Sequence, residues 1–157
     1  MVAATGNEGR RNEISFPACV PGVVKVLAAA NDAGGSGLAG YSNLPNPTAI
    51  GNELVFLAPG GLSLTQFPVV AAWIDPAVQY RGNAGTSMAA PHVSGLYALV
   101  KAGFKKLNVM KANGVTPHDL QDVNAWIVGS ASAPLTFNVA PAGQPAGFRT
   151  YRRVRLP

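Results

Sequence analysis

The chain has 157 residues, of which 48% are hydrophobic and 12% are charged, and its formal net charge is +5. This core-rich balance favours an α/β fold of buried parallel strands covered by helices. It excludes a membrane span, because no run of about 18 apolar residues occurs, and a disulfide within the chain, because Cys19 is the single cysteine. We expect Cys19 to be a buried or partly buried free thiol.

Short apolar runs predict core strands at residues 2–5, 23–29 and 54–57. Between the second and third of these, residues 30–48 are rich in Gly, Asn and Pro, which is typical of a loop or hairpin. For residues 63–81 the sequence predicts no helix or strand.

The second half of the chain is expected to contain two helices and a closing strand. Glycine ends helices readily, and Thr116 and Pro117 have the residue types of an N-cap and a first helical position. In chain order the expected elements are a helix at 87–102 that stops at Gly103, a helix at 117–128 that stops at Gly129, a loop at 130–147 and a strand at 148–155.

Ser87 stands where a helix is expected to begin. At such a position backbone N–H groups lack helical partners and the helix dipole favours negative charge, so an oxyanion forming beside the hydroxyl would find donors in place. Pro91 is expected within the first turn, where its missing N–H costs little. The surrounding stretch reads Gly85-Thr86-Ser87-Met88-Ala89-Ala90-Pro91-His92-Val93-Ser94-Gly95.

Asn7 follows a short apolar strand and is flanked by glycines, so its amide can donate to a developing alkoxide. Together with the Ser87 stretch, this segment resembles the oxyanion and serine motifs of the subtilisin-like serine proteases (subtilases). The resemblance extends to the connecting segments Phe16-Pro17, 23–29, Ala39-Gly40-Tyr41-Ser42-Asn43 and Phe56-Leu57-Ala58-Pro59-Gly60.

The resemblance implies a specific fold, reaction and substrate. Residues 1–157 would be a partial subtilase catalytic domain, the C-terminal half of a three-layer α/β fold with a mostly parallel sheet flanked by helices. Ser87 would be the nucleophile of peptide-bond hydrolysis and Asn7 the oxyanion donor. A polypeptide substrate would place a large apolar side chain in a pocket lined by Ala3, Ala4, Thr5 and Gly6, with Ser15 near its base.

The general base and its orienting carboxylate are expected outside this sequence, because in the family they precede the oxyanion asparagine. His92 belongs to the serine motif, and His118 is expected as a solvated residue at a helix start. We therefore expect the chain to need a partner, the N-terminal half with the catalytic Asp and His, and to be inactive alone. The alternative is a non-catalytic subtilase remnant, or pseudo-protease, that acts as a binding or structural piece.

No cofactor is expected to be required, and calcium is the single metal considered. The resemblance implies a weak cation site built from backbone carbonyls in the turn from residue 18 to residue 23, with Ala18, Val20 and Val23 as candidates. Val55 stands where the family often has a carboxylate, with Glu53 two residues earlier. Since hard cations prefer charged oxygen ligands, this replacement argues against calcium.

Three other functions are disfavoured. The glycines of 35–40 match a dinucleotide pattern, but Pro45 and Pro47 prevent the helix that should follow. The arginine-rich residues 149–155 indicate a terminal strand rather than a nucleic-acid site. An α/β-hydrolase needs a His after its acid, and none follows Asp119 or Asp122. By resemblance we expect a secreted or extracytoplasmic protein, although residues 1–4 show no signal peptide.

Overall fold

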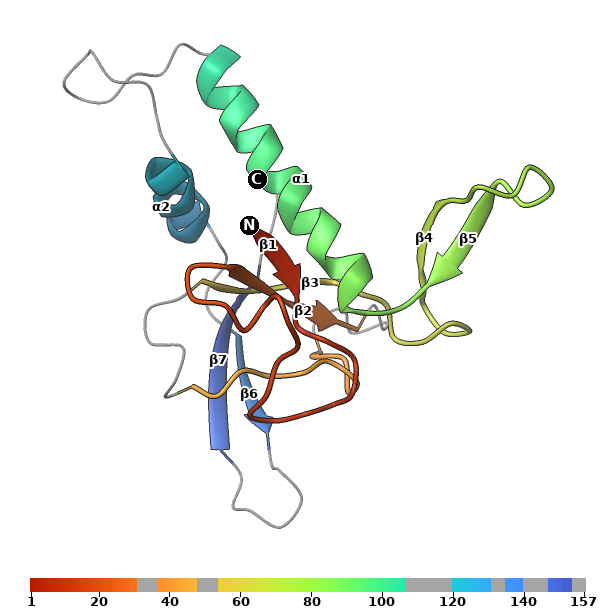
Figure 1. Cartoon of the computed structure of the whole chain (residues 1–157), viewed down its shortest axis with the longest axis horizontal. Helices are drawn as coiled ribbons and strands as arrows, with labels where there is room; N and C mark the ends of the chain where they lie inside the picture. Colours follow the sequence, from red (N-terminus) through yellow and green to blue (C-terminus); the bar gives the residue numbers. More distant parts are fainter. Residues whose placement is uncertain (31–36, 48–53, 107–119, 131–134, 140–146, 154–157) are drawn as a thin grey trace.

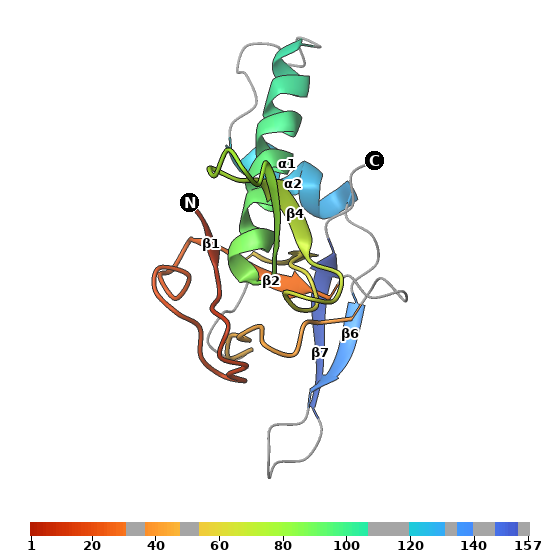
Figure 2. The same cartoon turned by 90° about the vertical axis from the view of Figure 1, so that its right-hand side faces the viewer.

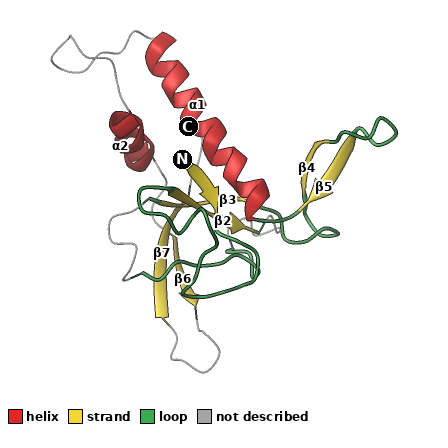
Figure 3. Cartoon of the chain, viewed as in Figure 1, coloured by secondary structure: helices red, strands yellow, loops and turns green. Residues whose placement is uncertain are grey.

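The computed structural model describes residues 1–30, 37–47, 54–106, 120–130, 135–139 and 147–153. It contains two helices and seven strands within these ranges (Figures 1 and 3). In chain order they are β1 (Val2–Ala4), β2 (Val24–Ala29), β3 (Val55–Pro59), β4 (Val69–Ala72), β5 (Tyr80–Asn83), α1 (Thr86–Lys106), α2 (Leu120–Ser130), β6 (Leu135–Val139) and β7 (Gly147–Arg153).

The main sheet has the strand order β1-β2-β3-β7-β6. Strands β1, β2, β3 and β7 run parallel to one another, and β6 is antiparallel to its partner β7. The three strands predicted in the first half of the chain are confirmed, as is the closing strand up to Arg153. An α/β fold with a mostly parallel sheet is therefore confirmed.

The predicted loop at 130–147 is wrong in its middle, because β6 lies there. Leu135, Phe137 and Val139 alternate with polar residues, which is a strand pattern with period two. The many Ala, Pro and Gly residues around this short segment hid the alternation. Strand β6 pairs with β7 over five residues, and the local sequence alone does not predict this pairing.

The helices differ from their predicted bounds. Helix α1 does not stop at Gly103 but continues to Lys106, and α2 continues through Gly129 to Ser130. A glycine in a helix costs only about 1 kcal/mol relative to alanine, so the surrounding helical residues can carry the helix through it. Pro91 is the sixth residue of α1 rather than part of its first turn. The expected N-cap at 116–117 lies outside the described residues.

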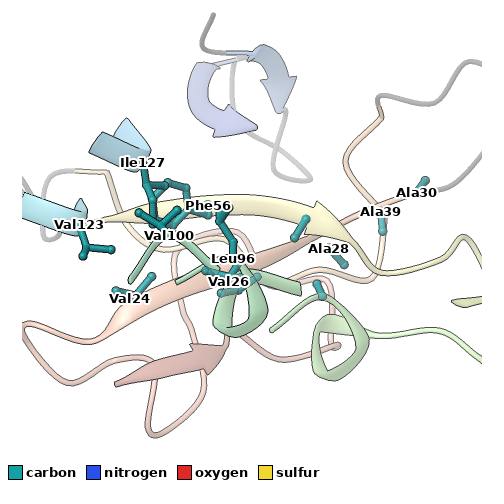
Figure 4. Packing of buried hydrophobic residues seen from close by; sticks show 13 residues of the cluster. Val24, Val26, Ala28, Ala30, Ala39, Phe56, Leu96, Val100, Val123 and Ile127 are labelled. Atoms are coloured by element: carbon teal, nitrogen blue, oxygen red, sulfur yellow. The ribbon is translucent and has the colours of Figure 1, made fainter. Parts of the chain in front are cut away.

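One face of the sheet packs against both described helices (Figure 4). Helix α1 runs along this face, and α2 covers its end (Figures 1 and 2). The shared cluster takes alternate residues from β2 and one apolar stripe from each helix. Its buried members are Val24, Val26, Ala28, Ala30, Ala39, Phe56, Ala58, Ala89, Val93, Leu96, Val100, Val123 and Ile127.

The opposite face of β2 and β3 packs against the segment 37–47. Leu44 is fully buried there against Leu27 and Leu57, and the backbone N–H of Ala39 donates to the Ala28 carbonyl. In the described part of this segment, residues 37–47, no helix follows the glycine pattern.

Strands β4 and β5 form a separate antiparallel hairpin that projects away from the main sheet (Figure 1). It fills the region for which the sequence predicts no element and leads directly into α1. Arg81 lies over the Trp73 ring, 4.9 Å from its centre. Within the described ranges, no helix combines the length and apolarity needed to cross a membrane.

Candidate functional site

The candidate site lies at the carboxyl edge of the parallel strands, where β1, β2 and β3 all end. Such an edge is the usual position of a binding crevice in an open α/β sheet. The N–H of Gly60, just after β3, donates to the Ala29 carbonyl at 2.9 Å, and the N–H of Gly85 donates to the Gly60 carbonyl at 2.8 Å. These two bonds bring the beginning of α1 to the end of β2. The hydroxyl of Tyr41 also donates to the Gly60 carbonyl, at 2.8 Å.

Ser87 is the second residue of α1 and is exposed. Among the described residues, neither its hydroxyl nor its backbone N–H has a hydrogen-bond partner. The first turn of α1 contains no acidic side chain, so nothing on the helix itself offsets its positive N-terminal dipole. The predicted nucleophile is thus accessible, beside an unused donor.

Asn7 is held in one orientation by Thr86. The Asn7 carbonyl oxygen Oδ1 accepts from the Thr86 N–H at 2.8 Å and from the Thr86 hydroxyl at 2.9 Å. The Gly6 N–H donates to the Thr86 hydroxyl at 3.2 Å, so that hydroxyl accepts from Gly6 and directs its single proton to Asn7. Because Oδ1 is engaged by two donors, the Asn7 NH₂ group must point elsewhere, and it has no partner among the described residues.

A second network fixes the loop that follows Asn7. Asn43 is fully buried; its Oδ1 accepts from the backbone N–H groups of Glu8 at 3.1 Å and Arg10 at 2.9 Å. Its own N–H donates to the Gly6 carbonyl at 3.0 Å, and its Nδ2 donates to the Glu8 carboxylate at 2.5 Å. This last bond holds the pKa of the exposed Glu8 carboxyl below its usual range.

At Gly85 the backbone passes close to the Asn7 amide and has a φ of 156°, which L side chains rarely adopt. A Cβ atom at Gly85 would lie 3.3 Å from Asn7 Nδ2, so the Asn7 side chain would have to shift by a few tenths of an ångström to accept it. The lack of a side chain at Gly85 thus leaves the Asn7 amide in its present position beside the start of α1.

The predicted pocket residues gather around the end of β1. The Ser15 N–H donates to the Thr5 carbonyl at 2.9 Å, and the Thr5 hydroxyl donates to the Val26 carbonyl at 3.2 Å. Ala3 turns inward and packs with Ala18 and Val23, and Ala4 is half-buried.

Neighbouring side chains lie close against Gly6 and leave no room for a side chain at this position. A Cβ at Gly6 would overlap the side chains of Ser15 and Asn43, and its φ of 103° is one that glycine tolerates best. The structure thus places Ser15 and Gly6 side by side.

His92 does not face Ser87. It lies five residues further along α1, which rotates it about 140° around the helix axis at 3.6 residues per turn. Its ring Nδ1 is 2.8 Å from the Met88 carbonyl, which can only accept, so this nitrogen carries the proton. His118 lies outside the described residues. Within the described part of the chain, no His reaches the Ser87 hydroxyl.

Two features of this region differ from the sequence-based expectation or were missed by it. Cys19 is exposed, not buried, because it lies in a surface turn while its neighbour Ala18 points into the core. Thr86 and Asn43 stand out in the sequence only as parts of motifs, and their positioning roles were missed. Their polarity within short, glycine-rich segments was the available signal.

The turn from residue 18 to residue 23 contains the three candidate cation ligands Ala18, Val20 and Val23. The carbonyls of Val20 and Val23 instead accept from the Lys25 ammonium. No cluster of three or more His, Cys, Asp or Glu residues that could hold a metal occurs in the described ranges.

Comparisons with known proteins agree on one family. The family model Peptidase_S8, described as the subtilase family, matches residues 1–149. Subtilisin-like protease 6 of Trichophyton equinum is 35% identical over 98 residues, which is 62% of this chain and 20% of that protein. An intracellular serine protease of Paenibacillus polymyxa is 31% identical over 105 residues, covering 64% of this chain and 27% of that protein. The chain thus spans about a fifth to a quarter of these relatives.

Solved structures show the same fold. The structure of the prenylagaramide maturation protease PagA has a TM-score of 0.59 and 30% identity, covering 84% of this chain and 40% of that one. The crystal structure of a lanthipeptide protease has a TM-score of 0.68 and covers 99% of this chain and 48% of that one. At 21% identity, the latter likeness concerns the fold alone.

Proposed function

Because this chain belongs to the subtilase family of serine proteases, we propose that it supplies the nucleophile Ser87 and the oxyanion donor Asn7 for peptide-bond hydrolysis. The observation that carries this proposal is the orientation of the Asn7 amide, whose oxygen is engaged by Thr86 while its NH₂ group stays available. The two bonds to Thr86 fix the direction in which the NH₂ group of the exposed Asn7 can donate.

In the proposed reaction, the Ser87 hydroxyl oxygen attacks the carbonyl carbon of the scissile peptide bond. Its proton passes to a histidine base, and the carbonyl oxygen becomes an oxyanion. The Asn7 NH₂ group and the Ser87 N–H donate to this oxyanion, at the positive end of the α1 dipole. The intermediate collapses to an acyl-enzyme as the amine leaves with the proton, and water then hydrolyses the ester.

We infer that the histidine base and its carboxylate come from a segment outside residues 1–157. His92 is turned away from Ser87 and its Nδ1 proton is directed to the Met88 carbonyl. Losing the base from such a triad costs a factor on the order of a million in kcat. Residues 1–157 are thus a partial catalytic domain that is active only when a segment carrying Asp and His completes it.

The proposed substrate is a polypeptide. Two of the similar solved structures are named as maturation proteases, for prenylagaramide and patellamide. The small residues Ala4 and Gly6, with Ser15 beside them, form the proposed wall and base of the pocket for the residue before the scissile bond. We propose an extracytoplasmic location from the family resemblance. Because one relative is named intracellular, fractionation of the source cells decides this point.

Hydrolysis of a fluorogenic peptide tests this function. The chain is measured alone and after mixing with a subtilase N-terminal segment that carries the catalytic Asp and His, with Ser87→Ala as the matched control. We expect turnover only in the mixture and none with Ser87→Ala. If the segment binds and no turnover appears, the alternative gains support: a non-catalytic remnant that acts as a binding piece.

A further inference from the structure

Strand β2 contains a fully buried lysine. Lys25 is 1% exposed and is the largest fully buried side chain among the described residues. Its neighbours in register are Ala3 on β1 and Val55 on β3, and neither carries a charge. Since a buried ammonium is costly unless polar groups solvate it, the positions of its hydrogen-bond acceptors matter.

Two backbone carbonyls of the turn that precedes β2 accept from the Lys25 ammonium. Lys25 Nζ donates to the Val23 carbonyl at 3.1 Å and makes a longer contact of 3.4 Å with the Val20 carbonyl. The same turn is braced by a bond from the Val23 N–H to the Val20 carbonyl at 3.3 Å. Two of the three carbonyls that were candidate metal ligands, those of Val20 and Val23, therefore contact an ammonium that belongs to the chain itself.

The residues around this turn do not fit a divalent metal. Calcium takes six to eight oxygen ligands at about 2.3–2.6 Å and favours carboxylates. Val55, beside Lys25 on β3, is aliphatic, and Glu53 lies outside the described residues. A divalent ion at the carbonyls of Val20 and Val23 would also lie next to the Lys25 charge, and like charges at such distances repel strongly in a buried site.

We propose that the Lys25 ammonium is the resident cation of this turn. It links the turn to β2 as a bound ion would, but through a covalently attached charge. The stability of the chain is then independent of calcium and unaffected by chelators. This proposal does not depend on Ser87 being catalytic, because it concerns the opposite end of the strands and is read out by stability.

Thermal unfolding of the full chain in excess calcium chloride and in EDTA tests the proposal, with circular dichroism as the signal. The variants are Val55→Asp, which adds a carboxylate but keeps Lys25, and Lys25→Ala with Val55→Asp, which opens the site and supplies the carboxylate. We expect the same Tm in both solutions for the unmodified chain. Val55→Asp should behave likewise, because the new carboxylate pairs with Lys25. The double variant should have a lower Tm in EDTA that calcium raises.

A rise in the Tm of the unmodified chain with calcium, equal to the rise in the double variant, would overturn the proposal. Lys25→Met provides a second measurement if the double variant does not fold. This variant keeps the apolar stem, and its Tm should fall equally in calcium and EDTA because the Val23 carbonyl loses its donor. An unchanged Tm for Lys25→Met would show that the ammonium does not support the turn.

Discussion

The hydrogen-bond donors at the two ends of strands β1 and β2 differ in whether they have a partner within the protein. At the amino end, the Lys25 ammonium is buried and donates to carbonyls of the preceding turn. At the carboxyl end, Asn7 and Ser87 are exposed, and within the described ranges their NH₂ and N–H groups donate to nothing. Both ends belong to the same sheet.

The difference separates donors that stabilise the fold from donors that are kept for a ligand. At the carboxyl end the side-chain donors of Asn43 and Thr86 are used, and the result is to fix Asn7 with its own donors free. Such preorganised, unused donors are what an oxyanion needs, because no reorganisation is then required during the reaction. We propose that the end with paired donors is structural and that the end with unpaired donors is the site of chemistry.

Removing the proposed nucleophile at the carboxyl end should have the largest effect on kcat. Ser87→Ala is expected to lower kcat of the protein completed with Asp and His by about a millionfold, because no covalent intermediate can form. Steady-state hydrolysis of a fluorogenic peptide measures it. Ser94→Ala, which removes an exposed hydroxyl on the same helix, is the control and should leave the rate unchanged. Equal rates for the two variants would show that Ser87 is not the nucleophile.

Removing the free amide should have the next largest effect. Asn7→Ala is expected to lower kcat by about 100- to 1000-fold with little change in KM, because the amide acts on the oxyanion and not on the bound substrate. This magnitude is the one measured for the side-chain oxyanion donor of subtilisin, a member of the same family. Steady-state kinetics over a range of peptide concentrations separates the two constants, and a change confined to KM would contradict the assignment.

Weakening the group that orients the amide should have a smaller effect. Thr86→Val keeps the Thr86 N–H but removes the hydroxyl, so Asn7 Oδ1 loses one of its two donors and the Gly6 N–H loses its acceptor. One such bond is worth about 0.5–1.5 kcal/mol, which corresponds to roughly a 2- to 10-fold loss of kcat. Thr86→Ser, which restores the hydroxyl, should recover the rate, and failure to do so would contradict a positioning role.

One buried hydroxyl, that of Tyr97, is a third case. It neither forms a hydrogen bond that would stabilise the described part of the fold nor lies where a ligand could reach it. The Tyr97 hydroxyl on α1 is shielded from solvent and has no partner among the described residues, and burial raises the pKa of Tyr97 to about 12. Replacing it by Phe is expected to leave stability at neutral pH unchanged or raised by no more than about 1 kcal/mol. Chemical denaturation measures the difference.

The pH dependence of this residue follows from the direction of the pKa shift. Above its ordinary value of 10, the unfolded phenol loses its proton while the folded one keeps it until about pH 12. Stability therefore falls as pH rises through this window, and Tyr97→Phe should remove part of that fall. An identical alkaline profile in both proteins would show that the Tyr97 pKa is not raised.

The sequence predicted the first three strands because they depend on short local patterns. Apolar runs identified β1, β2 and β3, and the motifs around Asn7 and Ser87 predicted a candidate site between the end of a strand and the start of a helix. Strand β6 was missed because its partner β7 is set by tertiary pairing. The end of α1 was misplaced because Gly103 costs less than its helical neighbours contribute.

The roles of particular side chains were harder to predict, because they depend on contacts between distant segments. Thr86 and Asn7 are 79 residues apart, and Asn43 reaches Glu8 across 35. In the sequence Lys25 is simply one residue of an apolar strand, and nothing local indicates that its ammonium turns back to the Val23 carbonyl. Cysteine is usually an interior residue, but the turn places Cys19 outside.

The central claim is that Ser87 is a nucleophile whose oxyanion donors, the Asn7 NH₂ group and the Ser87 N–H, are in place and whose histidine base comes from another segment. A fluorophosphonate probe that labels activated serines tests this most directly, with intact-mass detection and Ser87→Ala as control. The chain is treated alone and with a bound segment that carries the catalytic Asp and His. We predict labelling at Ser87 only in the presence of the segment. Labelling of the chain alone would contradict the claim that the base comes from outside residues 1–157, and no labelling with the segment bound would contradict the catalytic role itself.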